Sequence, residues 1–120
     1  MKAKIGILSE ELVRKRMIRI AEGKVTSKEH YPQFLFESLA VLSQLLSNEN
    51  VELLNLIARE KPNNLDELAE MSGRSIKDVT DTLEVLSSKG FACIDTKGGQ
   101  SRPIALFTTF EIVMVRSLLL

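Results

Sequence analysis

Residues 64–90 read NLDELAEMSGRSIKDVTDTLEVLSSKG, and this stretch predicts two helices joined by a four-residue turn. Asn64 and Glu67 form a capping-box pattern, which opens a short helix that ends at Gly73. Ser75 is the N-cap of a second helix that continues to about Lys89. One buried stripe at spacings of three and four residues runs along this second helix, made of Ile76, Val79, Leu83 and Leu86.

The sequence after this second helix predicts a β-hairpin. Two strand-like runs, 91–96 and 101–107, flank Lys97-Gly98-Gly99-Gln100, and a Gly pair that tolerates positive φ favours a two-residue turn. Helix, turn, helix and hairpin in this order are typical of a winged helix-turn-helix, whose second helix enters the DNA major groove. We therefore expect a mainly α, α+β fold with a recognition helix at about 75–89 and a wing at about 91–107.

The rest of the chain predicts an N-terminal extension before this domain. Before residue 34 we expect a strand at 3–8, a helix at about 10–22 capped by Ser9, and a polar loop at 24–33. After it we expect an extended stretch at 34–36, two helices at about 37–46 and 48–61, and a last strand at 108–115. The expected domains are thus a strand-helix extension, 1–33, and a winged helix-turn-helix, 34–120. Six of the eight residues in 39–46 are apolar, more than one stripe supplies, so we expect a homodimer.

Composition narrows the possible functions. No apolar run approaches the roughly 18 residues of a membrane span, and a single cysteine suits a reducing cytoplasm, where we place the protein. Cys93 and His30 are the only cysteine and histidine; one is expected in a strand and the other in a loop, and a Cys/His nucleophile also needs a third, orienting group. No cluster of Cys and His is present for a zinc site. No Gly-rich phosphate loop follows a strand. We therefore expect no enzymatic activity, no metal, no other cofactor and no membrane partner.

Charge is balanced overall but unevenly distributed. The chain has 16 Lys and Arg against 16 Asp and Glu. Residues 1–30 carry eight basic and four acidic side chains, whereas residues 47–90 carry five basic and nine acidic ones. Such a division suggests that the two regions face different partners, or face each other.

Several blocks of the sequence are similar to one family of proteins. These blocks are Phe36-Glu-Ser-Leu39, Leu46-Ser-Asn-Glu-Asn50, Leu53-Leu54, Leu65-Asp-Glu-Leu-Ala69, Gly73-Arg74, Thr82-Leu83-Glu-Val-Leu86, Lys89-Gly-Phe91 and Arg102-Pro103. They resemble the small prokaryotic, MarR-like winged helix-turn-helix proteins that are predicted transcriptional regulators. The runs at 4–8 and 16–20 also resemble the leader of that family. The resemblance implies DNA binding as a dimer, with the helix from Ser75 as the recognition helix and the hairpin around Gly98 as the wing.

The recognition helix departs from the resembled pattern at two positions. Where the family commonly has Asn and Arg, this chain has Asp78 and Asp81. A carboxylate near a phosphate costs on the order of 1 kcal/mol in solvent, although Asp can accept a hydrogen bond from the amino group of cytosine. The alternative is that these acids form a solvated face.

The candidate DNA-binding residues lie on the second helix and the wing. They are Arg74, Ser75, Lys77, Asp78, Thr80, Asp81, Lys97 and Arg102. Arg74 suits a phosphate at the start of the helix, and Arg102 suits the minor groove. A candidate accessory basic patch on the first helix consists of Arg14, Lys15, Arg16 and Arg19, which either contact DNA, pair with acids of the other subunit or form a solvated face.

Two functions follow from these patterns. The first is a dimeric transcriptional regulator that binds double-stranded DNA. The alternative is a protein-interaction module, antitoxin-like or an adaptor, whose acidic winged-helix face binds a basic protein partner.

Overall fold

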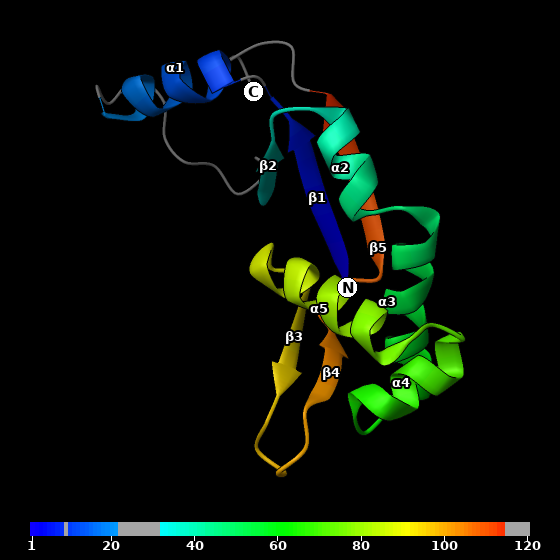
Figure 1. Ribbon diagram of the computed structural model, residues 1–120. Helices are drawn as coiled ribbons and strands as arrows, with labels where there is room; N and C mark the ends of the chain where they lie inside the picture. Colours follow the sequence, from blue (N-terminus) through cyan, green and yellow to red (C-terminus); the bar gives the residue numbers. More distant parts are fainter. Residues whose placement is uncertain (9, 22–31, 115–120) are drawn as a thin grey trace. The chain divides into compact units, whose positions relative to one another are not determined.

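The computed structural model describes residues 1–8, 10–21 and 32–114 and has an α+β fold (Figure 1). The coarse fold class predicted from the sequence is thus confirmed. The elements in chain order are β1 (Lys2–Ile7), α1 (Glu10–Ala21), β2 (Phe34–Phe36), α2 (Leu39–Leu45), α3 (Asn48–Glu60), α4 (Leu65–Ser72), α5 (Ile76–Ser88), β3 (Ala92–Asp95), β4 (Arg102–Ala105) and β5 (Thr109–Met114).

Internal contacts divide the chain into two compact units. One contains Met1 with residues 45–108, and the other contains residues 2–44 with 109–120. The sequence placed its boundary after residue 33 instead. The difference arises because β2 and β5 both pair with β1, which joins both ends of the predicted second domain to the N-terminal strand.

The unit of residues 2–44 and 109–120 is built on a parallel sheet in the order β2-β1-β5. Ile5 of the central strand is in register with Phe34 on one side and Ile112 on the other. Alternate residues Ala3, Ile5 and Ile7 share one face and are buried. The strands predicted at both ends of the chain are confirmed, whereas the predicted cap Ser9 and most of the predicted loop at 24–33 lie outside the described residues.

The helices of the other unit begin at local caps, as the sequence predicts. Ser47 Oγ accepts from the backbone N–H of Asn50 at 3.2 Å at the start of α3. Asn64 Oδ1 accepts from the N–H of Glu67 at 2.8 Å at the start of α4. The return bond of this capping box goes one residue further back, because Glu67 Oε2 accepts from Asn63 N–H at 2.6 Å.

The core of this unit forms where α5 packs against α4 and β3. Its fully buried side chains include Leu54, Leu68, Val79, Leu83, Leu86 and Phe91. Ile76, predicted to belong to the buried stripe, is instead 52% exposed. The prediction was wrong because Ile76 is the first residue of α5, where its side chain lies in a shallow depression beside Gln100 and Ser101.

The hairpin is present, but its predicted two-residue turn is wrong. β3 and β4 are antiparallel with Asp95 opposite Arg102, which leaves residues 96–101 as the connection. Only Gly99 of the Gly pair has a positive φ, 80°, and its N–H donates to Thr96 C=O. Asp95 Oδ1 accepts from Lys97 N–H at 3.0 Å, and this local bond turns the chain before the glycines are reached.

Candidate nucleic-acid interface

A tight turn joins α4 to α5. Gly73 ends α4 with φ of 72°, a left-handed conformation that glycine adopts without steric cost. The N–H of Arg74 donates to Ala69 C=O at 3.2 Å. Ser75, extended at φ −69° and ψ 157°, then caps α5 by accepting from Asp78 N–H at 3.1 Å. Ser75, a candidate DNA-binding residue, therefore already has its hydroxyl oxygen engaged by the helix.

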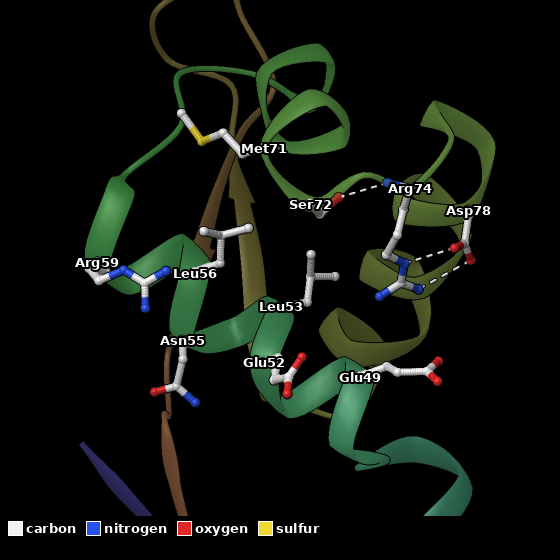
Figure 2. A pocket seen from close by; sticks show the side chains of 10 residues that line it. All are labelled: Glu49, Glu52, Leu53, Asn55, Leu56, Arg59, Met71, Ser72, Arg74 and Asp78. Atoms are coloured by element: carbon white, nitrogen blue, oxygen red, sulfur yellow. Dashed lines mark hydrogen bonds and ion pairs between the residues drawn. The ribbon is translucent and has the colours of Figure 1, made fainter.

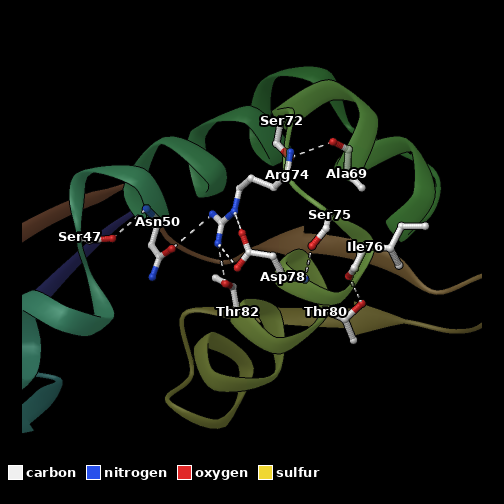
Figure 3. A network of polar contacts seen from close by, with 10 residues as sticks. All are labelled: Ser47, Asn50, Ala69, Ser72, Arg74, Ser75, Ile76, Asp78, Thr80 and Thr82. Atoms are coloured by element: carbon white, nitrogen blue, oxygen red, sulfur yellow. Dashed lines mark hydrogen bonds and ion pairs between the residues drawn. The ribbon is translucent and has the colours of Figure 1, made fainter.

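The Arg74 side chain is the centre of a polar network that Figure 3 shows. Its guanidinium makes a bidentate pair with Asp78, from Nε to Oδ2 at 2.7 Å and from Nη2 to Oδ1 at 3.1 Å. Nη2 also donates to Thr82 Oγ1 at 2.7 Å, and Nη1 donates to Asn50 Oδ1 at 3.4 Å. Only 20% of the side chain is exposed. The structure thus brings Arg74 and Asp78 together and links both to α3.

This pairing favours the charged form of both Arg74 and Asp78. The hydrogen bond from Arg74 lowers the pKa of Asp78 below its ordinary value. The same bond, opposed by partial burial, raises the pKa of Arg74, and the nearby carboxylate of Glu49 raises it further. Both groups are therefore charged at neutral pH.

The outward side of α5 carries a second ion pair. Lys77 Nζ lies 2.9 Å from Asp81 Oδ2, and the two side chains are 84% and 59% exposed. The hydrogen bond to Asp81 raises the pKa of Lys77. Lys77, Asp81 and Glu84 recur at positions four and three apart, so they lie on one face of the helix. Asp78 is also exposed, at 52% of its side chain, and it points toward Arg74 (Figure 3).

The remaining candidates lie on the first turns of α5 and on the hairpin. The Thr80 hydroxyl donates to Ile76 C=O at 2.7 Å, a bond along the helix itself. Arg102 Nη2 lies 3.1 Å from Asp95 Oδ2 across the hairpin. The pKa of Asp95 is lowered first by the N–H of Lys97 and then by Arg102. Lys97 is exposed, and no acidic side chain pairs with its ammonium within the described part of the chain.

The accessory basic patch is only partly described. Arg14 and Lys15 are exposed on α1, and Lys15 Nζ lies 3.1 Å from Glu11 Oε1, one turn earlier. The side chains of Arg16 and Arg19 lie outside the described residues.

A groove of about 700 Å³ was not predicted; it lies between α3 and the end of α4, and Arg59, Arg74 and Asp78 also line it (Figure 2). Leu53, Leu56 and Met71 form its apolar lining, and Met71 is 46% exposed. Glu49 and Glu52 are exposed along its α3 side. The sequence signal for it was the helical spacing of these α3 residues, which occupy positions 49, 52, 53 and 56.

Other kinds of site find no support among the residues that the structure describes. No group of three or more His, Cys, Asp or Glu there is arranged to hold a metal ion. None of the helices in the described ranges is long and apolar enough to cross a bilayer. Cys93 is a free, partly buried thiol in β3.

Comparison with known proteins places the chain in one family. The family model HVO_A0114 matches residues 45–112, more than half of the sequence. The chain belongs to the HVO_A0114 family. The match includes α3, α4, α5 and the hairpin, and with them every member of the Arg74 network. Searches of curated proteins and of solved structures found no significant match.

Proposed function

We propose that this protein is a transcriptional regulator that binds double-stranded DNA as a homodimer through a winged helix-turn-helix. In this proposal α5 enters the major groove and the β3–β4 hairpin is the wing. One observation carries the proposal: α4, the tight turn at Gly73, α5 and an antiparallel hairpin follow one another within a single compact unit. The resemblance to MarR-like regulators over the same residues supports it.

Charge pairing within the unit reduces the repulsion that the acidic residues of α5 would exert on DNA phosphates. Asp78 is paired with Arg74, and Asp81 is paired with Lys77. A paired carboxylate repels a phosphate less than an isolated one, because its cation lies at a similar distance with the opposite sign. Within the described residues, Glu84 is the one acid of α5 without a salt-bridge partner closer than 4 Å. Lys97 on the hairpin then supplies an unpaired positive charge.

Fluorescence anisotropy with a labelled duplex from upstream of the protein's own coding region tests this proposal. We expect the logarithm of the binding constant to fall linearly with the logarithm of salt concentration, with a slope of about −0.9 for each phosphate neutralised. Absence of binding at ~50 mM salt would contradict the proposal.

A pair of matched variants tests the proposed surface. Lys97→Ala should weaken binding to any sequence and reduce the salt slope by about 1. Arg59→Ala removes the same charge from α3, where Arg59 pairs with Glu60, and should leave the slope unchanged. Equal effects of the two variants would indicate that general charge, and not the hairpin, attracts the DNA.

The groove between α3 and α4 favours a second candidate function, an adaptor that binds a cationic segment of a partner protein. The exposed acids Glu49 and Glu52 beside an apolar lining complement an amphipathic basic segment; of the two arginines in the lining, Arg74 is neutralised by Asp78, and Arg59 pairs with Glu60. Co-expression with the products of adjacent genes tests this function. A genuine partner should co-purify with the parent chain and be lost when Glu49 and Glu52 are both changed to Lys, but not when Glu70, on α4, is changed to Lys.

A further inference from the structure

We propose that Arg74 is a positioning residue, which fixes α5 against α3, and that it does not bind a phosphate. The proposal assigns a role to one of the candidate DNA-binding residues. Its consequence for DNA binding rests on the proposed function, whereas its structural part can be tested on the free protein.

Most of the hydrogen-bond donors of Arg74 are already engaged within the protein. A guanidinium has five N–H groups in a fixed plane. Four of them are occupied, by two bonds to Asp78, one to Thr82 and one to Asn50. A bidentate phosphate contact would therefore require the fork to Asp78 to open, which would leave an unpaired carboxylate beside the phosphate.

The α3 end of the network, Asn50, is itself anchored. Asn50 is held by its own bonds, since its backbone N–H donates to Ser47 Oγ and its Nδ2 donates to Leu45 C=O at 2.9 Å. These bonds aim Oδ1 of Asn50 toward Nη1 of Arg74 (Figure 3). A continuous set of hydrogen bonds thus connects the start of α3 with the first two turns of α5.

The positive charge of Arg74 is neutralised within the protein. The charge of Arg74 is cancelled by a carboxylate less than 3 Å from its Nε, and four-fifths of the side chain is covered. Such a pair adds little to the release of counterions from DNA, which reflects the number of phosphates neutralised. Arg74 therefore influences DNA affinity through the placement of α5 and leaves the salt slope unchanged.

Replacement by lysine separates the two roles. A lysine at this position would keep the positive charge that a phosphate contact needs but would lack the planar fork that Asp78, Thr82 and Asn50 require. We expect Arg74→Lys and Arg74→Ala to weaken DNA binding to a similar extent, about tenfold, with the salt slope of the parent protein. Parent-like affinity of Arg74→Lys, or a slope reduced by about 1 in Arg74→Ala, would overturn the proposal.

Double-mutant cycles on the free protein test the structural part. Arg74→Ala and Asn50→Ala should each lower the Tm by roughly 5 °C, and their effects should be clearly less than additive. Lys77→Ala with Asp81→Ala is the matched cycle for an exposed pair and should be nearly additive. Additive effects for Arg74 and Asn50 would overturn the positioning role. Coupled effects in a protein that binds no DNA would uphold that role and refute the proposed function alone.

If Arg74→Ala fails to fold, two milder variants still test whether Arg74 positions α5 or binds a phosphate. Thr82→Val keeps the shape of the side chain and removes the hydroxyl acceptor, and Asp78→Asn keeps the side chain and removes its charge. Both should weaken DNA binding, and Thr82→Val should keep the salt slope of the parent protein, because it leaves the charges of Arg74 and Asp78 in place. An increase in affinity for Asp78→Asn would show that Asp78 competes with phosphate for Arg74, and would overturn the proposal.

Discussion

Individual carboxylates in the α4–α5 and hairpin region have cations close to them in the sequence. Asp78 follows Arg74 by four residues, Asp81 follows Lys77 by four, and Asp95 meets Arg102 across the hairpin. The i, i+4 spacing places Lys77 and Asp81 on adjacent turns of α5, whereas Arg74 lies in the turn just before the cap Ser75 and reaches Asp78 on the first turn of the helix. The acids that distinguish α5 from the resembled recognition helix are therefore compensated within the same surface.

The ionisation of Asp78 makes stability depend on pH in the acid range. Its pKa in the folded state is below the ordinary value of 3.8, because Arg74 donates to it. A group with a depressed folded pKa contributes stability above its unfolded pKa, and this contribution is lost as pH falls through the folded pKa. We therefore expect the Tm to fall as pH decreases from about 4. Glu49 also faces Arg74 and belongs to the same charged cluster.

Thermal unfolding followed by circular dichroism between about pH 2 and pH 6 measures this dependence. Asp78→Asn should be less stable than the parent at pH 6, and the difference should shrink toward pH 2. Asp95 has a lowered pKa as well, so the parent and the variant share that contribution and it cancels in the comparison. A constant difference between the two proteins across the range would contradict the prediction.

At the scale of elements, the turn between α4 and α5 depends on the conformation of one glycine. Gly73 has φ of 72°, and a Cβ built there meets no atom within 4 Å. Gly73→Ala should therefore cost backbone strain alone, about 1 kcal/mol of unfolding free energy. Gly98 is the matched control, since it has equal space but no positive φ.

Urea unfolding of the two alanine variants tests this difference. Gly98→Ala should be neutral or slightly stabilising, because alanine restricts the unfolded chain. Equal destabilisation by both substitutions would mean that the left-handed conformation of Gly73 is not needed for the turn.

The elements also show where sequence patterns succeed. The bounds of α3, α4 and α5 were predicted within two residues, because caps and stripes depend on residues three or four apart. The exposure of Ile76 and the six-residue hairpin connection were missed. Both depend on how far a neighbouring element extends, which periodicity does not encode.

At the scale of the whole molecule, exposed apolar residues on α2 bear on the expected homodimer. Leu42 and Leu45 are buried, whereas Leu39 and Val41 of the same helix are 48% and 55% exposed. A second subunit that covers these two side chains would bury apolar area that the described part of one chain leaves open to solvent.

Light scattering during size-exclusion chromatography measures the association state. We expect a mass about twice 13.4 kDa for the parent chain. Val41→Asp should shift the mass toward the monomer, because a buried unpaired charge disfavours association. Ala58→Asp adds the same charge at an exposed position of α3, in the other compact unit, and is the control. A parent mass near 13.4 kDa would contradict the homodimer.

The sequence by itself determined the α+β class, the caps of α3, α4 and α5, and the hairpin after α5, since each of these depends on interactions between near neighbours. It also contained the four-residue spacing of Arg74 and Asp78, although spacing alone did not reveal them as a pair. The tertiary structure decided which distant residues meet. Asn50 joins Arg74 from 24 positions away, β5 joins β1 from the other end of the chain, and a Cβ at Gly6 would lie 2.9 Å from Pro32. These contacts depend on the path of the chain between the partners, and no local pattern of residues specifies that path.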